Sequence, residues 1–187
     1  MTIMMTKNHD SVLSVTDLLD RPGASRRVDV AMGVPDGLVL PLVTVHNPLR
    51  LAGVIESVVQ GLLVRGTVEA VLSMSCARCL TTVEQTVCAG VTELFSDPTV
   101  PGHPDEDLEV DAGYEICEGT IDLDTLLRDA VVPAAPYQPL CNFDCRGLCP
   151  SCGVNRNDVD CDCADRERDP RWAALEGLRL PPDAAGA

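Results

Sequence analysis

The sequence predicts an α+β protein in which an antiparallel sheet and a few helices carry a C-terminal cysteine-rich module. Apolar and polar residues alternate over residues 62–76 and again over residues 83–95. A period of two is typical of strands that bury one face. Six of the ten cysteines fall within residues 141–163, and this clustering indicates a compact module that the sulfurs hold together.

Length and charge limit the classes of protein that the chain can represent. Its 187 residues are enough for one domain with a small appendage. The net charge is −15, and such an acidic protein does not hold phosphate backbones by bulk charge. We therefore expect a basic protein partner, or contact with RNA through a local patch only.

The N-terminal region predicts a protein that stays in the cytoplasm. Residues 1–19 lack the apolar core of a secretory signal, and no apolar run approaches the ~18 residues of a membrane span. We expect no membrane association. In a reducing compartment, ten cysteines indicate metal binding rather than disulfides.

The first half of the chain predicts short strands joined by turns. Besides the two long strands, β-rich segments occur at residues 12–19, where a helical turn follows, and at residues 28–34, 38–45 and 54–59. Pro41 indicates an edge position or a break. We expect turns at residues 35–37, at Asn47-Pro48 and at residues 60–61. These strands predict an antiparallel meander, with a barrel as its closed alternative.

The second half predicts an acidic loop and two helices. Residues 97–118 contain eight acidic residues and no Lys or Arg, which is typical of a solvated spacer; a docking site for a basic partner is the alternative. A helix is expected over residues 121–132, capped by Thr120 and stopped by Pro133. A final helix is expected after Asp169, with its apolar face formed by Trp172, Leu175 and Leu178.

These elements predict four regions along the chain. They are a disordered start over residues 1–11, a sheet domain over 12–140, a zinc module with the final helix over 141–180, and a tail over 181–187.

The strongest chemical signal is a set of four closely spaced cysteines. Cys149 and Cys152 are separated by two residues, which lets two thiolates converge on one ion, and Pro150 and Gly153 favour the turn. A second pair, Cys161 and Cys163, follows a polar loop. Four sulfurs at about 2.3 Å around Zn²⁺ complete a tetrahedral site, which is structural because no coordination position stays open.

A second four-cysteine site is the next hypothesis. Cys76 and Cys79 lie at the tip of the hairpin between the two long strands, and Cys141 and Cys145 precede the first site. Together they would attach the C-terminal module to the sheet and add folding free energy. The alternatives are a single zinc with the hairpin thiols free, or an exchange of Cys145 for Cys163 on the first ion. Cys88 and Cys117 have no near partner.

The remaining polar residues do not predict an enzyme. His9, His46 and His103 have no spacing to a Ser, Cys or Glu that forms a catalytic motif, and no glycine-rich phosphate loop is present. We therefore expect no small-molecule substrate.

Three arginines lie near the cysteine pairs and are candidates for partner binding. They are Arg78, Arg146 and Arg156. Guanidinium groups recognise phosphates; the alternative is that these groups offset thiolate charge or pair with Asp144, Asp158 and Asp160.

Three segments together resemble the YceD family of large ribosomal RNA subunit accumulation proteins. They are the Cys76-Ala-Arg-Cys79-Leu80 hairpin, the helix that begins Gly119-Thr-Ile-Asp-Leu, and residues 144–157, which read DCRGLCPSCGVNRN. The resemblance extends from about residue 12 to residue 178. It implies a bacterial-type cytoplasmic or organellar protein that is required for accumulation of the large-subunit ribosomal RNA.

The resemblance favours a non-enzymatic assembly factor that binds a ribosomal protein or the pre-ribosomal large subunit, with a possible contact to ribosomal RNA. It also implies that the two zinc sites are separable, with the Cys149 site as the optional one. Two alternatives remain. One is a zinc-ribbon regulator that binds nucleic acid, and the other is a thiol redox switch that uses Cys76 and Cys79.

Overall fold

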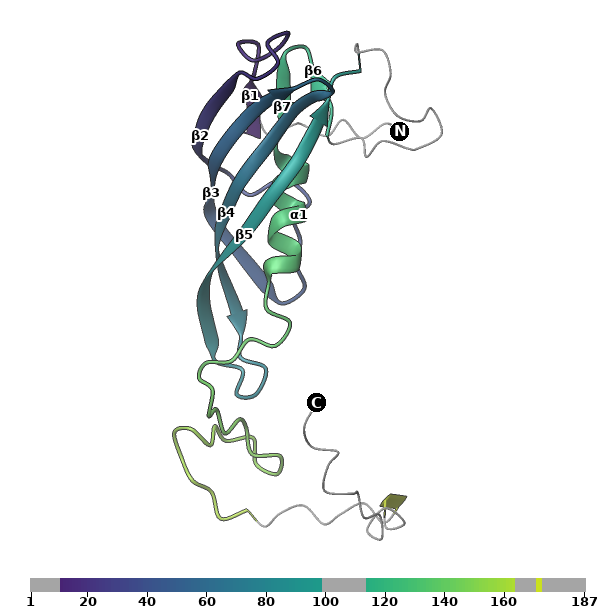
Figure 1. Cartoon of the computed structure of the whole chain (residues 1–187). Coiled ribbons are helices and arrows are strands. Elements are labelled where there is room, and N and C mark those ends of the chain that lie inside the picture. Colours follow the sequence, from purple (N-terminus) through teal and green to yellow (C-terminus); the bar gives the residue numbers. More distant parts are fainter. Residues whose placement is uncertain (1–10, 99–113, 164–170, 173–187) are drawn as a thin grey trace, which may run out of the picture.

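The computed structural model of the chain describes residues 11–98, 114–163 and 171–172. Within these ranges the protein has seven strands and one helix. A four-stranded sheet runs along an elongated molecule, a three-stranded sheet lies at one end, and the cysteine-rich segment lies at the other (Figure 1). The predicted α+β class with antiparallel sheets is confirmed.

The large sheet is a meander in the order β2-β3-β4-β5. Its strands are β2 Ser25–Met32, β3 Val43–Val58, β4 Gly61–Ser75 and β5 Thr82–Ser96. The last two agree with the predicted strands at 62–76 and 83–95, because alternation persists for their whole length. The sheet stays open, with β2 and β5 as its edges, so the barrel alternative is not formed by the described residues.

β3 corrects the prediction for the first half of the chain. The end of the segment predicted as a strand at 38–45 and nearly all of the one predicted at 54–59 lie within one strand of sixteen residues. Asn47-Pro48 lies inside this strand instead of forming a turn, and the register against β4 shifts between His46 and Arg50. Pro48 has no N–H to donate, and the irregular register accommodates it within the strand.

The small sheet corrects the start of the predicted helix. It has the order β1-β7-β6, with β1 Val12–Ser14, β6 Ile116–Cys117 and β7 Thr120–Asp122. Residues 120–122, which the sequence assigned to the helix and its cap, pair with β1 instead. β6 likewise lies within the segment that was predicted as a loop. Pairing with a distant strand thus overrides the local helical pattern.

The helix α1 spans Asp124–Ala134 and follows β7 directly. Its N-cap is Leu123, which makes no side-chain cap bond, while the carboxylate of Asp122 accepts the N–H of Asp124 at 3.0 Å. The predicted cap Thr120 donates its hydroxyl to the Cys117 carbonyl. Pro133 lies in the last turn, and the helix ends one residue after it.

The core lies between one face of the large sheet and α1. α1 packs against β5 and β4 through its buried stripe Leu126, Leu127, Ala130 and Val131. The sheet contributes aliphatic side chains and one aromatic ring to this core, including Leu49, Leu51, Ile55, Leu62, Val64, Val68, Leu72 and Phe95. The opposite face of the sheet carries polar side chains such as Arg65 and Glu69 together with partly exposed apolar ones such as Leu63.

Two glycines allow a close approach of β3 and β4. Gly53 and Gly66 are directly paired across the two strands. A Cβ atom on Gly53 would overlap the Arg65 carbonyl, and one on Gly66 would overlap the Ala52 carbonyl. Only glycine fits at these positions, since any side chain would force the two backbones apart.

Several predictions fall outside the described residues. They include the disordered start with His9, most of the acidic loop with His103, the final helix with Leu175 and Leu178, and the tail. Trp172 is described and is exposed. Among the described residues, no helix is long and apolar enough to cross a membrane.

Candidate metal centres

The structure groups eight cysteines into two sets of four at one end of the large sheet. The inner cluster is Cys76, Cys79, Cys141 and Cys145, and the outer cluster is Cys149, Cys152, Cys161 and Cys163. In each cluster all four sulfurs lie within 4.8 Å of one another. These are the two groups of four that the sequence favoured.

The inner cluster joins the β4–β5 hairpin tip to the segment that follows α1. The Cys76 and Cys145 sulfurs are 3.8 Å apart, and those of Cys79 and Cys141 are 3.5 Å apart. Tetrahedral Zn²⁺ with bonds of about 2.3 Å separates its sulfurs by about 3.8 Å. Cys76, Cys79 and Cys145 are buried, so the donor set and its spacing fit a structural zinc ion.

Polar groups of the protein point at the inner sulfurs. The N–H of Arg78 lies 3.5 Å from the Cys76 sulfur, and the side-chain amide of Asn157 donates to the Cys145 sulfur at 3.3 Å. The Thr81 hydroxyl lies 3.0 Å from the Cys79 sulfur. Such donors stabilise thiolates and orient the ligands.

The outer cluster is built within one short segment. The N–H of Cys149 bonds to the Val154 carbonyl at 2.8 Å, and Leu148 and Asn155 form a β-bridge. Of the four cysteines only Cys149 is buried. This cluster therefore shapes a local loop close to the surface.

The two Cys-x2-Cys turns share one backbone conformation. Leu80 donates its N–H to the Cys76 carbonyl, and Gly153 donates its N–H to the Cys149 carbonyl, at 3.0 and 2.9 Å. The donor residue is left-handed in both turns, with φ 62° at Leu80 and φ 76° at Gly153. This left-handed conformation costs conformational free energy for leucine, which has a Cβ atom, and little for glycine, which has none.

Each cluster contains one thiol whose pKa is clearly lowered and another whose pKa is clearly raised. Burial raises the pKa of Cys76, but N–H groups of Cys79 and Arg78 outweigh it and lower the pKa to about 6. Backbone N–H groups of Cys152 and Ser151 lower the pKa of Cys149 to about 6. Hydrogen bonds to neighbouring sulfurs raise the pKa of Cys141 and Cys163 to about 12. A bound cation would be needed to hold all four thiolates of a cluster at neutral pH.

The loop of the outer cluster is bonded to the inner cluster. Besides its contact with Cys145, Asn157 accepts the N–H of Arg146 at 2.8 Å through its side-chain oxygen. The N–H of Arg156 bonds to the Gly147 carbonyl at 2.9 Å. Asn157 was not a predicted site residue, and nothing in its polar sequence context distinguishes it from its neighbours.

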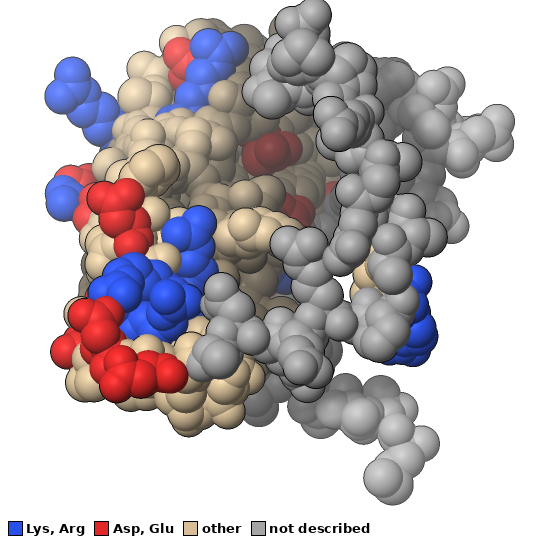
Figure 2. All heavy atoms as spheres, turned by 90° about the horizontal axis from the view of Figure 1, so that it is seen from below, with Lys and Arg blue, Asp and Glu red and all other residues tan. Residues whose placement is uncertain are grey.

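The three predicted partner-binding arginines surround these clusters in different states. Arg78 donates to the carbonyls of Phe143 and Cys145, at 3.4 and 3.0 Å. Arg146 forms an ion pair with Asp160 at 2.6 Å. Within the described part of the chain, the side chain of Arg156 makes no hydrogen bond or ion pair. Figure 2 looks at this end of the molecule and shows arginine and acidic side chains intermingled on its surface.

The remaining two cysteines lie away from both clusters. Cys88 is exposed on β5 and Cys117 is exposed on β6. The sequence left both unassigned, and the structure places neither within a cluster of four.

An apolar hollow of about 230 Å³ adjoins the inner cluster. Its rim carries Leu42, Leu80 and Tyr137, and the exposed fraction of Tyr137 is 96%. Leu42, like Leu80, is left-handed, with φ 61°. No lining residue is charged, and this hollow could not be predicted from the sequence because its walls come from three separate segments.

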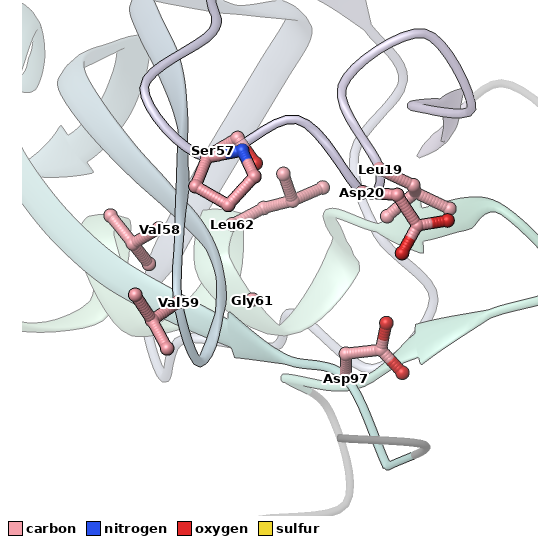
Figure 3. A pocket seen from close by; sticks show the side chains of 9 residues that line it. Leu19, Asp20, Ser57, Val58, Val59, Gly61, Leu62 and Asp97 are labelled. Atoms are coloured by element: carbon pink, nitrogen blue, oxygen red, sulfur yellow. The ribbon is translucent and has the colours of Figure 1, made fainter.

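A smaller hollow lies at the opposite end of the sheet, where β3 turns into β4. Its volume is about 90 Å³, and mostly apolar residues line it together with Ser57, Asp20 and Asp97 (Figure 3). Sites for organic ligands are usually several hundred Å³. This hollow is too small for such a ligand, and it contains no nucleophile paired with a base.

Sequence comparison decides the family. The sequence-family model described as "Large ribosomal RNA subunit accumulation protein YceD" matches residues 64–179 of this chain. The chain belongs to the YceD family. The matched range contains most of β4, all of β5 and α1, and both cysteine clusters.

Bacterial and plant relatives extend the match toward the N-terminus. An uncharacterized protein of Mycobacterium tuberculosis is 38% identical over 165 residues, which cover 86% of this chain and 77% of the relative. One of Mycobacterium leprae is 36% identical, covering 91% and 78%. The chloroplastic "Large ribosomal RNA subunit accumulation protein YCED homolog 1" of Arabidopsis thaliana is 25% identical, covering 81% and 50%. No solved structure matches the chain.

Proposed function

We propose that this YceD-family protein is a non-enzymatic assembly factor that is required for accumulation of the large-subunit ribosomal RNA. Membership of the family carries the proposal, and plant relatives bear the corresponding name. In this role the protein acts in the cytoplasm and binds a basic ribosomal protein or pre-ribosomal RNA. It transforms no small molecule.

The two cysteine clusters would each hold one structural zinc ion. Their sulfurs have the number and spacing of a tetrahedral site. Zinc at the inner cluster would fix the C-terminal module against the hairpin tip. Zinc at the outer cluster would fix the loop that carries Arg156. The metal thus supplies a rigid surface and no chemistry.

The intermingled charges of this surface favour an assembly factor over a regulator that binds free nucleic acid. Arg146 is paired with Asp160, and the chain as a whole carries a net charge of −15. Binding to naked nucleic acid requires several uncompensated cations. A contact with RNA would therefore be confined to the side chain of Arg156 and the exposed part of the Arg78 side chain.

The proposal is tested in a strain that lacks the gene. We expect a lower ratio of large-subunit to small-subunit ribosomal RNA, restored by the wild-type chain. Arg156→Ala should restore it less well if this side chain contacts RNA. Arg27→Ala is the matched control, because Arg27 is exposed on β2 at a distance from the clusters. A normal ratio of the two RNAs in the deletion strain would overturn the proposal.

A further inference from the structure

The strand β5 forms an unusually long free edge of the large sheet. Among the described residues, β5 pairs with β4 over all of its fifteen residues without a shift in register, and its other edge forms only an isolated bridge from Ser96 to Glu115. The opposite edge, β2, has eight residues. In Figure 1 β5 lies at the margin of the sheet along most of the molecule's length.

The hydrogen-bond pattern shows which groups of β5 face outward. The Cys76 N–H bonds to the Thr81 carbonyl, and the Asp97 N–H bonds to the Gln60 carbonyl. In an antiparallel ladder, bonded residues alternate with residues whose N–H and C=O point away. Odd-numbered residues of β5 therefore face β4. The outward-facing residues are Thr82, Glu84, Thr86, Cys88, Gly90, Thr92 and Leu94.

The next even-numbered residue confirms this assignment. Ser96 donates its N–H outward to the Tyr114 carbonyl at 2.9 Å. Among the residues that the structure describes, none bonds to the outward main-chain groups of residues 82–94. Seven alternate residues of β5 thus each offer an outward N–H and C=O to a further strand.

The β5 edge lacks the features that usually protect an edge strand. Proteins blunt such edges with charged side chains, especially Lys, with Pro or bulges, or keep them short. Residues 82–96 contain no Lys, Arg or Pro, and their only charged residues are Glu84 and Glu93. On β2, by contrast, Arg26 bonds to Asp17 and to the Ser14 carbonyl, at 2.6 and 2.7 Å. Among the described residues, the β2 edge thus carries an arginine that bonds across it, and the β5 edge carries no such side chain.

Charge indicates what pairs with this edge. The described residues 79–98 and 114–127, which include β5, contain seven Asp or Glu and no Lys or Arg. A second copy would bring the same negative charge to the edge and be repelled. A nucleic acid would be repelled as well, and it lacks the N–H and C=O groups of a strand. An extended basic polypeptide satisfies both the hydrogen bonds and the charge.

We propose that the free edge of β5 binds an extended, positively charged polypeptide segment as a fifth strand of the sheet. The inference rests on the proposed function for its setting, and it names the class of partner as a basic protein segment. The binding itself is a property of the purified chain.

The test uses full-length protein and a blocked peptide of about twelve residues in which Lys and Thr alternate. The control peptide has the same sequence and charge, but its central amides are N-methylated, so that neither of its edges can pair. We expect the control to bind at least about tenfold more weakly, because several hydrogen bonds are lost. Equal binding of the two peptides would overturn the proposal, since charge alone would then explain the association.

A variant of β5 tests the same edge from the protein side. Thr86→Pro with Thr92→Pro removes two outward N–H groups and leaves the β4 ladder intact. Thr86→Ala with Thr92→Ala is the matched control, because it removes the hydroxyls and keeps the N–H groups. We expect at least about tenfold weaker peptide binding for the proline pair and near-wild-type binding for the alanine pair. Unchanged thermal unfolding verifies that the proline pair folds.

Other outcomes separate the competing occupants. Concentration-dependent dimerisation that the proline pair abolishes would show that a second copy occupies the edge, and would overturn the proposal. Failure of the peptide to bind wild-type protein would also overturn it. Neither result affects the ratio of ribosomal RNAs in the deletion strain, so the proposed function stands or fails separately.

Discussion

The inner and outer cysteine clusters hold together different parts of the molecule. The inner cluster joins residues that are far apart in sequence, such as Cys76 and Cys145 with a separation of 69, and it is largely buried. The outer cluster closes a loop within residues 149–163, and only Cys149 is buried. Metal at the inner cluster would thus support tertiary structure, whereas metal at the outer cluster would shape one local surface.

The largest effect is expected from Cys76→Ser. The change removes a fully buried ligand, so the inner cluster should lose its metal and the module its attachment to β4 and β5. We expect metal content to fall from two zinc ions per chain to one, and the melting temperature to fall by about 10 °C or more. Elemental analysis and thermal unfolding measure this. An unchanged metal content would show that the inner cluster binds no zinc.

Cys161→Ser is the matched change in the outer cluster. It should also remove one zinc ion per chain, but the melting temperature should fall by only a few degrees, because this ligand lies in a local loop. The same two measurements apply. A loss of stability as large as that of Cys76→Ser would contradict the distinction between the clusters.

Acid should release metal from both clusters. Without metal, the raised pKa values of Cys141 and Cys163, about 12, keep these thiols protonated at neutral pH. Zinc must displace at least one proton from each cluster, so its affinity should fall about tenfold per displaced proton for each unit of decreasing pH. A pH indicator measures the protons released when zinc is added to the apo protein. Absence of release at neutral pH would refute this expectation.

Asn157→Ala should weaken the connection between the clusters. The side chain donates to the Cys145 sulfur and accepts the Arg146 N–H, so its loss removes support from an inner ligand. We expect zinc affinity of the inner cluster to fall about tenfold. Competition with a chelator measures it, with Asn142→Ala, an exposed change nearby, as the control. Equal affinity of the wild type and the variant would show that the clusters act independently.

The smallest effect is expected at the turn residues. Gly153→Ala meets no atom within 4 Å, so its cost is that of the left-handed backbone, about 1 kcal/mol. Zinc binding to the outer cluster should become less favourable by that amount. Gly147→Ala offers a comparison, because its Cβ would also lie 3.0 Å from the Arg78 carbonyl. A smaller cost at Gly147 than at Gly153 would be inconsistent with these contacts.

Prediction from the sequence worked where the signal was local. β4 and β5 follow from an alternation that continues over fifteen residues, and both Cys-x2-Cys turns follow from their spacing. The same reasoning misplaced the start of α1, because residues 120–122 have a helical pattern but pair with β1. It also divided β3 at Asn47-Pro48, since a proline inside a strand is locally indistinguishable from a turn.

The sequence by itself determined the antiparallel class, the two long strands and the eight cysteines that form clusters. These features depend on spacings of a few residues, which the chain itself encodes. Only the tertiary structure decided that Asn157 reaches the Cys145 sulfur and that, among the described residues, Arg146 is paired while Arg156 is not and β5 is an open edge. Each of these depends on which distant segments meet. The free energy of such contacts comes from packing and pairing across the fold, and no local pattern records it.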